Sequence, residues 1–545
     1  MNRLFRSTLV ISTLSFLIPV IASASSYYIA ANGNDSNSGS KASPWQHAPG
    51  MPNCKANCAG VTPQAGDSII FRGGDTWHFG NASLTPYVGG KSWNFSWSGA
   101  SGSPIYVGVD QSWYSGGSWA RPVFTGDDPV TTSAVSSCTY DFNNVNVVLL
   151  GTDSHIRLDN FEMMGFCYSG TSGVNGGFVN FGGTDAVVEN MYFHGMTIES
   201  SGTDDEQVAI HGSGNGFKAD LTNQCLYNVF DNSDGSYGNY GNYPNGRATL
   251  EAIQNACAVV AFSVFNRVSN GLVSSTSIVH DNLFHDMYDP SLWGGRNHGN
   301  IWNVNNDGLQ PLGAQKFYNN VMYNINEGVG VWFQQNPVGY YFNNVSWNIS
   351  NSANCLRVGG SNVSTLLPVT TMYIYNNTWD APCTVRGTAP SPGGDPAQNG
   401  PVYFQNNHMI GFGISSFADG KGSLYSCDAG ATCNWIDNGN ELFQTEAAAN
   451  AQGYTASNSY APGSGGSTIG AGANLSNMCG TFSADSEFCQ GTSDGVSEQG
   501  SAGGEIAYDP AIPMVPRQSS WDIGAYKFSG AQSPNPPTGL TASVQ

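Results

Sequence analysis

The stretch Tyr340-Tyr341-Phe342-Asn343-Asn344-Val345-Ser346 decides the fold, because its pattern recurs along the middle of the chain. In each copy, apolar residues flank a polar pair whose second member is Asn. The five copies occupy residues 278–284, 316–322, 340–346, 373–379 and 403–409. The recurring asparagines, 24 to 38 residues apart, are Asn282, Asn320, Asn344, Asn377 and Asn407. Such uneven spacing is typical of a solenoid whose coils differ in loop length.

A repeated asparagine at one position of each coil has an architectural explanation. Short strands of successive coils lie side by side, and a stacked Asn can hydrogen-bond the turns above and below it. We therefore expect the five asparagines to form an internal ladder at one bend. We assign them to architecture rather than to catalysis.

The composition limits the classes of protein to which the chain can belong. Its 545 residues include 39 acidic and 18 basic side chains, which gives a net charge of −21. Charged residues make up 10% of the chain, against about 25% in an average soluble protein. Aromatic residues at 12% exclude a disordered chain, and the few basic residues argue against a nucleic-acid partner. The composition favours a large all-β extracellular protein.

The first residues have the features of an export signal. Arg3 and Arg6 precede an apolar stretch over residues 9–21, and Ala22-Ser23-Ala24 follows as a small-residue cleavage site. We assign residues 1–24 to a secretory signal peptide. No later stretch has the ~18 apolar residues that cross a bilayer, so we expect no membrane span. The mature protein is expected to be a monomer, secreted into the extracellular space or the periplasm.

Twelve cysteines agree with an oxidising compartment and fall into six pairs of sequence neighbours. Disulfides within these pairs are the simplest connectivity, although spacing alone does not determine it. The pairs are Cys54 with Cys58, Cys138 with Cys167, Cys225 with Cys257, Cys355 with Cys383, Cys427 with Cys433, and Cys479 with Cys489. Zinc is not favoured, because no second Cys/His pair stands at a zinc-like spacing from Cys54 and Cys58.

Three blocks resemble a known architecture. The strand Tyr27-Tyr28-Ile29-Ala30 with its polar turn at residues 32–36, and the strand at residues 66–74, resemble the opening of secreted right-handed parallel β-helix proteins of the pectate-lyase and polygalacturonase type. Residues 521–526 resemble their final strand. The resemblance implies an all-β, right-handed parallel β-helix over residues 25–530, with long inserted loops. Residues 531–545 form a Pro-rich tail that resembles a truncated fibronectin type III start.

Two acidic residues are the leading catalytic candidates. Aligned on the repeated Asn, the first strands of successive coils begin near residues 271, 308, 328 and 355, and Asp307 and Glu327 stand just ahead of two of them. Equivalent positions in adjacent coils are about 4.8 Å apart, so the carboxyl groups should reach the ~5–10 Å separation that glycosidases use. Both residues also suit a plain turn, which is the alternative.

The surrounding motifs only partly match a known hydrolase family. Asn305-Asn306-Asp307-Gly308 resembles the Asn-Thr-Asp-Gly motif of polygalacturonases, but Asn326-Glu327-Gly328 replaces the Asn-x-Asp-Asp motif that follows in that family. The family's Gly-His-Gly and Arg-Ile-Lys motifs have no counterpart. Asp204 and Asp205, ahead of a strand at residues 208–212, are a second candidate pair. A solvated loop or calcium ligands are the alternatives for them.

Other residues are candidates for binding substrate. Residues 284–302 concentrate His, Asp, Arg and Trp between two coils, and imidazole and aromatic rings there suit acid–base work and contacts with sugars. The expected substrate-binding residues are Asp286, Asp289, Arg296, His298, Trp332 and Arg357. We expect no required cofactor and no bound metal. Calcium is left open, because residues 231–235 resemble a shortened calcium loop without its terminal Glu.

These features predict a carbohydrate-active enzyme that acts on an extracellular polysaccharide or oligosaccharide. A glycoside hydrolase with paired carboxylates is the leading hypothesis, since the candidate face is rich in acids and poor in Lys. A polysaccharide lyase with a Lys or Arg base, and calcium as an option, is the alternative; Lys218 and Arg296 support it. A third hypothesis is a non-catalytic carbohydrate-binding or structural solenoid. The sugar, the linkage and the stereochemistry are not encoded in any recognisable motif.

Overall fold

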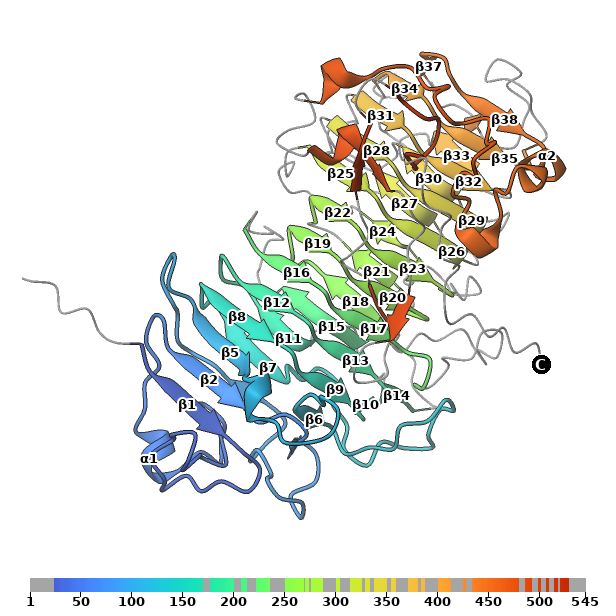
Figure 1. Cartoon of the computed structure of the whole chain (residues 1–545). Coiled ribbons are helices and arrows are strands. Elements are labelled where there is room, and N and C mark those ends of the chain that lie inside the picture. Colours follow the sequence, from blue (N-terminus) through green and yellow to red (C-terminus); the bar gives the residue numbers. More distant parts are fainter. Residues whose placement is uncertain are drawn as a thin grey trace, which may run out of the picture.

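The structure of the protein is a computed structural model, in which three long parallel sheets run along one axis (Figure 1). It describes residues 24–169, 177–199, 207–212, 222–235, 250–268, 270–273, 276–287, 300–303, 314–325, 329–333, 338–349, 354–358, 371–380, 384–387, 400–412, 425–427, 434–479, 486–492, 498–500, 506–508, 514–517 and 520–528. Within these ranges the strands stack in chain order, from the blue N-terminal end to the orange end in Figure 1.

Most coils contribute one strand to each of the three sheets, here named sheets 1, 2 and 3 in the order in which the chain meets them. Sheet 1 contains β1 (Ser26–Ile29), β2 (Ser68–Phe71), β5 (Ile105–Val109), β8 (Ile156–Asp159), β12 (Val187–Glu189), β16 (Gln224–Leu226), β19 (Val259–Ala261), β22 (Ile278–His280), β25 (Gln315–Tyr318), β28 (Val338–Phe342), β31 (Thr371–Tyr375), β34 (Val402–Gln405) and β37 (Trp435–Asp437).

Sheet 2 follows sheet 1 in each coil after a short bend. It contains β3 (Thr76–His78), β6 (Val123–Thr125), β9 (Glu162–Met164), β13 (Tyr192–His194), β17 (Val229–Asp231), β20 (Val264–Asn266), β23 (Leu283–His285), β26 (Val321–Ile325), β29 (Val345–Ile349), β32 (Thr378–Asp380), β35 (His408–Ile410) and β38 (Leu442–Gln444).

Sheet 3 completes the coil. It contains β4 (Trp93–Asn94), β7 (Val148–Gly151), β11 (Gly177–Phe181), β15 (Gln207–Gly212), β18 (Leu250–Gln254), β21 (Asn270–Val273), β24 (Trp302–Asn303), β27 (Val329–Phe333), β30 (Asn354–Val358), β33 (Thr384–Gly387) and β36 (Tyr425–Cys427). The predicted all-β parallel β-helix is therefore confirmed.

The remaining described elements are short. They are the helices α1 (Ala56–Ala59) and α2 (Glu446–Ala451), the parallel pair β10 (Cys167–Tyr168) and β14 (Thr197–Ile198), and the antiparallel pairs of β39 (Gln490–Thr492) with β42 (Met514–Pro516) and β40 (Glu498–Gly500) with β41 (Ile506–Tyr508). No helix in the described ranges has the length and apolar character that crossing a membrane requires.

The core consists of inward-facing side chains that stack from coil to coil. Phe193, Phe230, Phe265 and Phe284 occupy one register position on four consecutive strands of sheet 2. Their ring centroids are 5.2, 5.0 and 4.4 Å apart, and the rings are nearly parallel. All four are buried. Identical positions in a parallel stack thus place like side chains in contact, which keeps the interior closely packed.

The bend between sheets 1 and 2 explains the paired asparagines. β28 ends at Phe342 and β29 begins at Val345, so Asn343 and Asn344 form the whole bend. Asn343 has a positive φ of 57°, a left-handed conformation that Asn adopts more readily than most residues. The next residue, Asn344, is fully buried, and its side chain points along the stack to the neighbouring coils.

The second asparagines form the predicted ladder. Asn282 Nδ2 donates to Asn320 Oδ1 (3.0 Å), Asn320 Nδ2 to Asn344 Oδ1 (3.3 Å) and Asn344 Nδ2 to Asn377 Oδ1 (3.1 Å). Asn377 Nδ2 donates in turn to Asn407 Oδ1 (2.9 Å). Each of these Oδ1 atoms also accepts the preceding ladder residue's backbone N–H. The prediction that the five asparagines stack at one bend is confirmed.

The ladder is longer than the sequence pattern indicated. At one end Ser263 N donates to Asn282 Oδ1 (3.0 Å), and Asn228 N donates to the Ser263 hydroxyl (3.1 Å). At the other end Asn407 Nδ2 donates to Glu441 Oε1 (3.0 Å). The stack therefore begins with Asn and Ser and is closed by a carboxyl group, and only its middle part is uniform.

The C-terminal region packs on the solenoid at the same bend. Arg517 is fully buried and donates to the carbonyl oxygens of Gly524 and Ala525, at 2.9 Å each, and to Asn343 Oδ1 at 3.1 Å. Gly524 N donates to Asn406 O (2.7 Å). Residues 521–526, predicted as a final strand, instead form a bend at residues 523–525 between two bridge residues, Trp521, which pairs with Gly472, and Tyr526. The prediction was wrong because these residues cover the bend rather than extend a sheet.

Disulfides join four of the six predicted neighbour pairs. They are Cys54–Cys58, Cys138–Cys167, Cys225–Cys257 and Cys479–Cys489. Cys355 is also disulfide-bonded. Cys383 and Cys433 and the Cys427 side chain lie outside the described residues, so the other two pairings stay predictions. Residues 1–23 of the predicted signal peptide, and the tail at 531–545, also lie outside.

Candidate functional site

Sheet 3 differs from the other two sheets in the chain segments that join it to its neighbours. Two residues connect β25 of sheet 1 to β26 of sheet 2. By contrast, β23 ends at His285 and β24 of sheet 3 begins at Trp302, and β24 ends at Asn303 while β25 begins at Gln315. Long segments therefore enter and leave sheet 3 on both sides, as expected for the face of a solenoid that carries function.

The registers of sheet 3 place a row of side chains on its outer face. Val179, Ile210 and Ile253 are buried in the core at equivalent positions of β11, β15 and β18. Because side chains alternate along a strand, the residue that follows each of them faces outward. These residues, together with their counterparts on β27 and β30, are Asn180, His211, Gln254, Trp332 and Arg357. We call these five residues the outer row.

Asn180, His211 and Gln254 form a hydrogen-bonded group across three adjacent coils. Asn180 Nδ2 donates to His211 Nδ1 (3.0 Å), and the His211 side chain also bonds to Gln254. Burial lowers the pKa of His211, and the hydrogen bond to Gln254 offsets only part of this. His211 is therefore a neutral imidazole at pH 7. Asn180 is buried, and its Oδ1 has no hydrogen-bond partner in the described part of the chain.

Trp332 and Arg357 form the second part of the outer row. The two residues are register partners on β27 and β30, and the Arg357 guanidinium carbon lies 3.9 Å from the centroid of the Trp332 ring. Stacking of this kind holds a guanidinium in a fixed orientation. The backbone of Arg386 on β33 is the next register partner of Arg357. Trp332 and Arg357, which were both predicted from the sequence to bind substrate, thus lie together on sheet 3.

The predicted catalytic acids border the same sheet in sequence. Asp204, Asp205, Asp307 and Glu327 lie outside the described residues, and so do Asp289, Arg296 and His298. Asp204 and Asp205 stand shortly before β15, Asp307 follows β24, and Glu327 stands two residues before β27. Their separations and roles stay predictions.

The alignment that paired Asp307 with Glu327 needs a correction. It took residues 308–310 as the sheet 3 strand of their coil. The registers show that this strand is β24, because Trp302 pairs with Leu272 on β21 and with Val331 on β27. Asp307 therefore follows its strand, whereas Glu327 precedes the next one. The error arose because two of the longest segments surround a two-residue strand, which no periodicity reveals.

Asp286 is the remaining predicted substrate-binding residue, and it lies at the end of β23 in sheet 2. Its carboxylate accepts hydrogen bonds from His285 Nδ1 and Asn324 Nδ2, both at 2.8 Å. Burial opposes its charged form, but the hydrogen bond and positive charge of His285 outweigh burial and lower its pKa. Asp286 also has a positive φ of 51°, so its described contacts are those of a bend residue.

The loop at residues 231–235 was compared above with a calcium loop. Its two carboxylates contact side chains of the protein itself. Asp234 Oδ2 pairs with His194 Nδ1 (2.8 Å), and Asp231 Oδ1 accepts from Asn266 Nδ2 (2.9 Å). His194 Nε2 contacts Glu162 Oε1 at 3.0 Å, so its ring is held between two carboxylates. Among the described residues, no group of three or more His, Cys, Asp or Glu is arranged to hold a metal ion.

Sequence reasoning missed Asn180, His211 and Gln254. Residues 208–212 were recognised as a strand, but its partners were not, since coil lengths vary too much for a register to be counted. A signal was present in each case, because each polar residue directly follows a branched aliphatic residue, namely Val179, Ile210 or Ile253. Pairing those three ends required the three-dimensional stack.

The fold and the outer row define this chain as a parallel β-helix protein with a polar row on one sheet. No family model and no curated protein matches it. Solved structures that resemble it include the pectate lyase Pel9A, with a TM-score of 0.37 and 15% identity over 93% of this chain and 98% of that chain.

Two further solved structures show a similar degree of likeness. For the GH136 lacto-N-biosidase from Eubacterium ramulus, the TM-score is 0.32 and the identity 11%, over 77% of this chain and 68% of that one. For the PL6 family alginate lyase AlyGC, the values are 0.40 and 14%, over 70% and 51%. Each activity belongs to the protein so named, and the fold of this chain rests on its own strand registers.

Proposed function

We propose that the protein is a secreted carbohydrate-active enzyme that holds an extracellular polysaccharide along the outer row of sheet 3. The observation that carries the proposal is that one face holds two groups of hydrogen-bonding or aromatic side chains, three on the adjacent strands β11, β15 and β18 and two on β27 and β30, with β21 and β24 between them. Successive positions on a parallel sheet are about 4.8 Å apart, a regular spacing that suits a polymer of repeating sugar units. Four described disulfides support an oxidising compartment outside the cytosol.

The proposed reaction is hydrolysis of a glycosidic bond by paired carboxylates. Asp307 and Glu327 belong to segments that adjoin β24 and β27, next to Trp332. One carboxyl group would protonate the leaving oxygen, and the other would act as nucleophile or activate water, depending on their separation. Arg357, held on Trp332, would donate to sugar oxygens beside the cleaved bond. His211, as a neutral imidazole, would bind a hydroxyl group farther along the chain.

A polysaccharide lyase is the second candidate, and one observation favours it. The Arg357 guanidinium lies on the Trp332 ring, on the outer face of sheet 3. A guanidinium there would neutralise the carboxylate of an acidic sugar, which a lyase requires before it removes a proton from the neighbouring carbon. The net charge of −21 weighs against this candidate, because it repels a polyanionic substrate.

The test is product analysis of the purified protein on neutral and acidic polysaccharides. A hydrolase releases reducing ends without ultraviolet absorbance, whereas a lyase also produces an absorbing unsaturated sugar. We expect reducing ends alone. Unsaturated product would replace the hydrolase proposal with the lyase, and binding without any product would replace both with a non-catalytic solenoid.

A further inference from the structure

The N-terminal end of the solenoid contains a cavity that lies apart from the outer row. Its volume is about 650 Å³, within the ~300–1,000 Å³ range of small-molecule sites. It opens between the turn after β1, the chain leading into α1, and residues 82–87. These segments all precede β4, the first strand of sheet 3, whereas Trp332 and Arg357 belong to β27 and β30.

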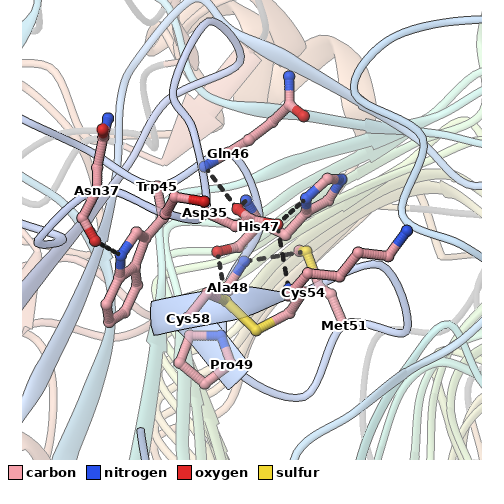
Figure 2. Close-up of a disulfide and its surroundings, with 12 residues drawn as sticks. Asp35, Asn37, Trp45, Gln46, His47, Ala48, Pro49, Met51, Cys54 and Cys58 are labelled. Atoms are coloured by element: carbon pink, nitrogen blue, oxygen red, sulfur yellow. Dashed lines mark hydrogen bonds and ion pairs between the residues drawn. A yellow bond between two sulfur atoms is a disulfide. The ribbon is translucent and has the colours of Figure 1, made fainter. Parts of the chain in front are cut away.

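The charged groups in the cavity floor are already compensated. Asp35 Oδ1 accepts from the backbone N–H groups of Gln46 (3.0 Å) and His47 (2.9 Å), and Asp35 Oδ2 contacts His47 Nδ1 (2.8 Å) (Figure 2). His47 Nε2 faces the carbonyl oxygen of Tyr87 at 3.0 Å. Burial opposes the charged form of Asp35, but the hydrogen bonds and charge of His47 prevail and lower its pKa. The Asp35 carboxylate is therefore already bound by protein donors.

The walls are fixed before any ligand arrives. The Cys54–Cys58 disulfide (Figure 2) ties the segment that carries Lys55. Lys55 N donates to Asp35 Oδ2 (3.3 Å). On the opposite side, Leu84 N donates to Asn81 O (3.1 Å). A wall that is ordered in advance lowers the entropy cost of binding.

The exposed groups of the cavity indicate the class of ligand. Leu84 is 40% exposed, the highest value among the large hydrophobic side chains in the described ranges, and it lines the cavity beside Tyr87. The other lining groups are mainly amides and hydroxyls, among them Asn34, Ser36 and Asn53. Lys55 also lines the cavity, and it contacts Asp35 through its backbone N–H.

We infer that this cavity is a second carbohydrate-binding site, which takes a neutral sugar unit of a polysaccharide separately from the outer row of sheet 3. A sugar ring offers an apolar C–H face, which would cover Leu84 and Tyr87, and hydroxyl groups, which would bond the amides and hydroxyls of the walls. The site requires no catalysis. It would hold the polymer at one end of the solenoid while other units occupy the outer row.

The experiment is affinity electrophoresis of the whole protein in gels that contain neutral polysaccharides, in which binding slows migration. Leu84→Asp places a charge on the sugar-facing wall, and Ala82→Trp fills the cavity; both side chains are exposed, so folding is preserved. Val130→Asp is the matched control, because Val130 is 36% exposed and lies outside the cavity. Arg357→Ala weakens the outer row and leaves the cavity intact.

We expect Leu84→Asp and Ala82→Trp each to weaken binding about tenfold on at least one neutral polysaccharide. Val130→Asp should leave binding unchanged, and the Arg357→Ala protein should still respond to Ala82→Trp. If neither cavity variant alters migration on any polysaccharide that retards the wild type, or if none retards it, the inference is overturned. Loss of turnover in Asp307 or Glu327 variants bears only on the proposed enzyme and not on this site.

Discussion

The bend between sheets 1 and 2 and the outer face of sheet 3 belong to the same coils but follow opposite rules. At the bend, two residues connect the strands, and Asn282, Asn320 and Asn344 repeat one set of hydrogen bonds. On sheet 3, no two adjacent coils in the described outer row carry the same residue, and long segments flank most strands.

The difference separates architecture from function. A buried polar group must be paired, and in a stack it can be paired by its own copy one coil away, so repetition is the stable solution at the bend. An outward-facing position has no such requirement, so each coil can present different chemistry to a ligand. If the two regions are independent, substitutions on sheet 3 should change turnover and not stability, and substitutions at the bend should do the reverse.

The largest expected effect is on sheet 3. Asp307→Asn and Glu327→Gln keep side-chain size while removing the charge, so turnover on an identified substrate should fall by about 10²–10⁴-fold. The melting temperature should not change. Asp110→Asn changes a half-buried carboxylate that pairs with Lys41 near the N-terminal end; it is the control and should keep full turnover. Full activity in both site variants would remove these residues from the reaction.

The second effect belongs to the ladder. Asn344→Ala removes the acceptor for the backbone and side chain of Asn320, and it deprives Phe317 O of a donor. Several buried polar groups are then unpaired, so urea unfolding should show a loss of about 3 kcal/mol. Turnover per folded molecule should be unchanged.

The control for the ladder is an exposed asparagine within β29. Asn348 has a positive φ of 50°, and Asn348→Gly retains this conformation, so it should change the free energy of unfolding by less than about 0.5 kcal/mol. A fall in turnover without a fall in stability in Asn344→Ala would contradict the division between the two regions.

A third prediction concerns His194 on the outer face of sheet 2, between Asp234 and Glu162. Burial opposes its charged form, but the hydrogen bonds and charges of the two carboxylates raise its pKa to about 9. Because the pKa is higher in the folded state, this stabilisation is full below about pH 6.5 and is lost as pH rises through about 9. His194→Gln should cost about 2 kcal/mol at pH 6. The difference from wild type should shrink by pH 10, as measured by thermal unfolding.

The smallest effect is expected at Glu441, which closes the ladder. Part of its side chain is exposed, but Oε2 is buried without a hydrogen-bond partner in the described ranges. Burial raises its pKa well above the ordinary value, so its contribution to stability is full below about pH 4.5 and declines as pH rises. Glu441→Gln should stabilise the protein by about 1 kcal/mol at pH 8 and by less at pH 4. If the stability difference between Glu441→Gln and wild type is the same at both pH values, the carboxyl group is not buried in solution.

What could be predicted from the sequence differs between the bend and sheet 3. The ladder was predictable because its second asparagine recurs within a fixed local pattern, as at Asn320 and Asn377. Four disulfides were predictable because each joins cysteines that are consecutive in the sequence, 4 to 32 residues apart. Ser263 and Glu441 escaped detection because they make the ladder's hydrogen bonds with different side chains.

The sequence by itself determined the parallel β-helix and the register of one bend, because the same local pattern is required in every coil to pair the same buried groups. Only the tertiary structure decided which residues share the outer face of sheet 3, and it placed His211 beside Asn180 and Arg357 on Trp332. It also brought together the three separate segments that line the cavity near Leu84. The physical reason is that these neighbours are joined through strand pairing across loops of unequal length, and no local pattern records that distance.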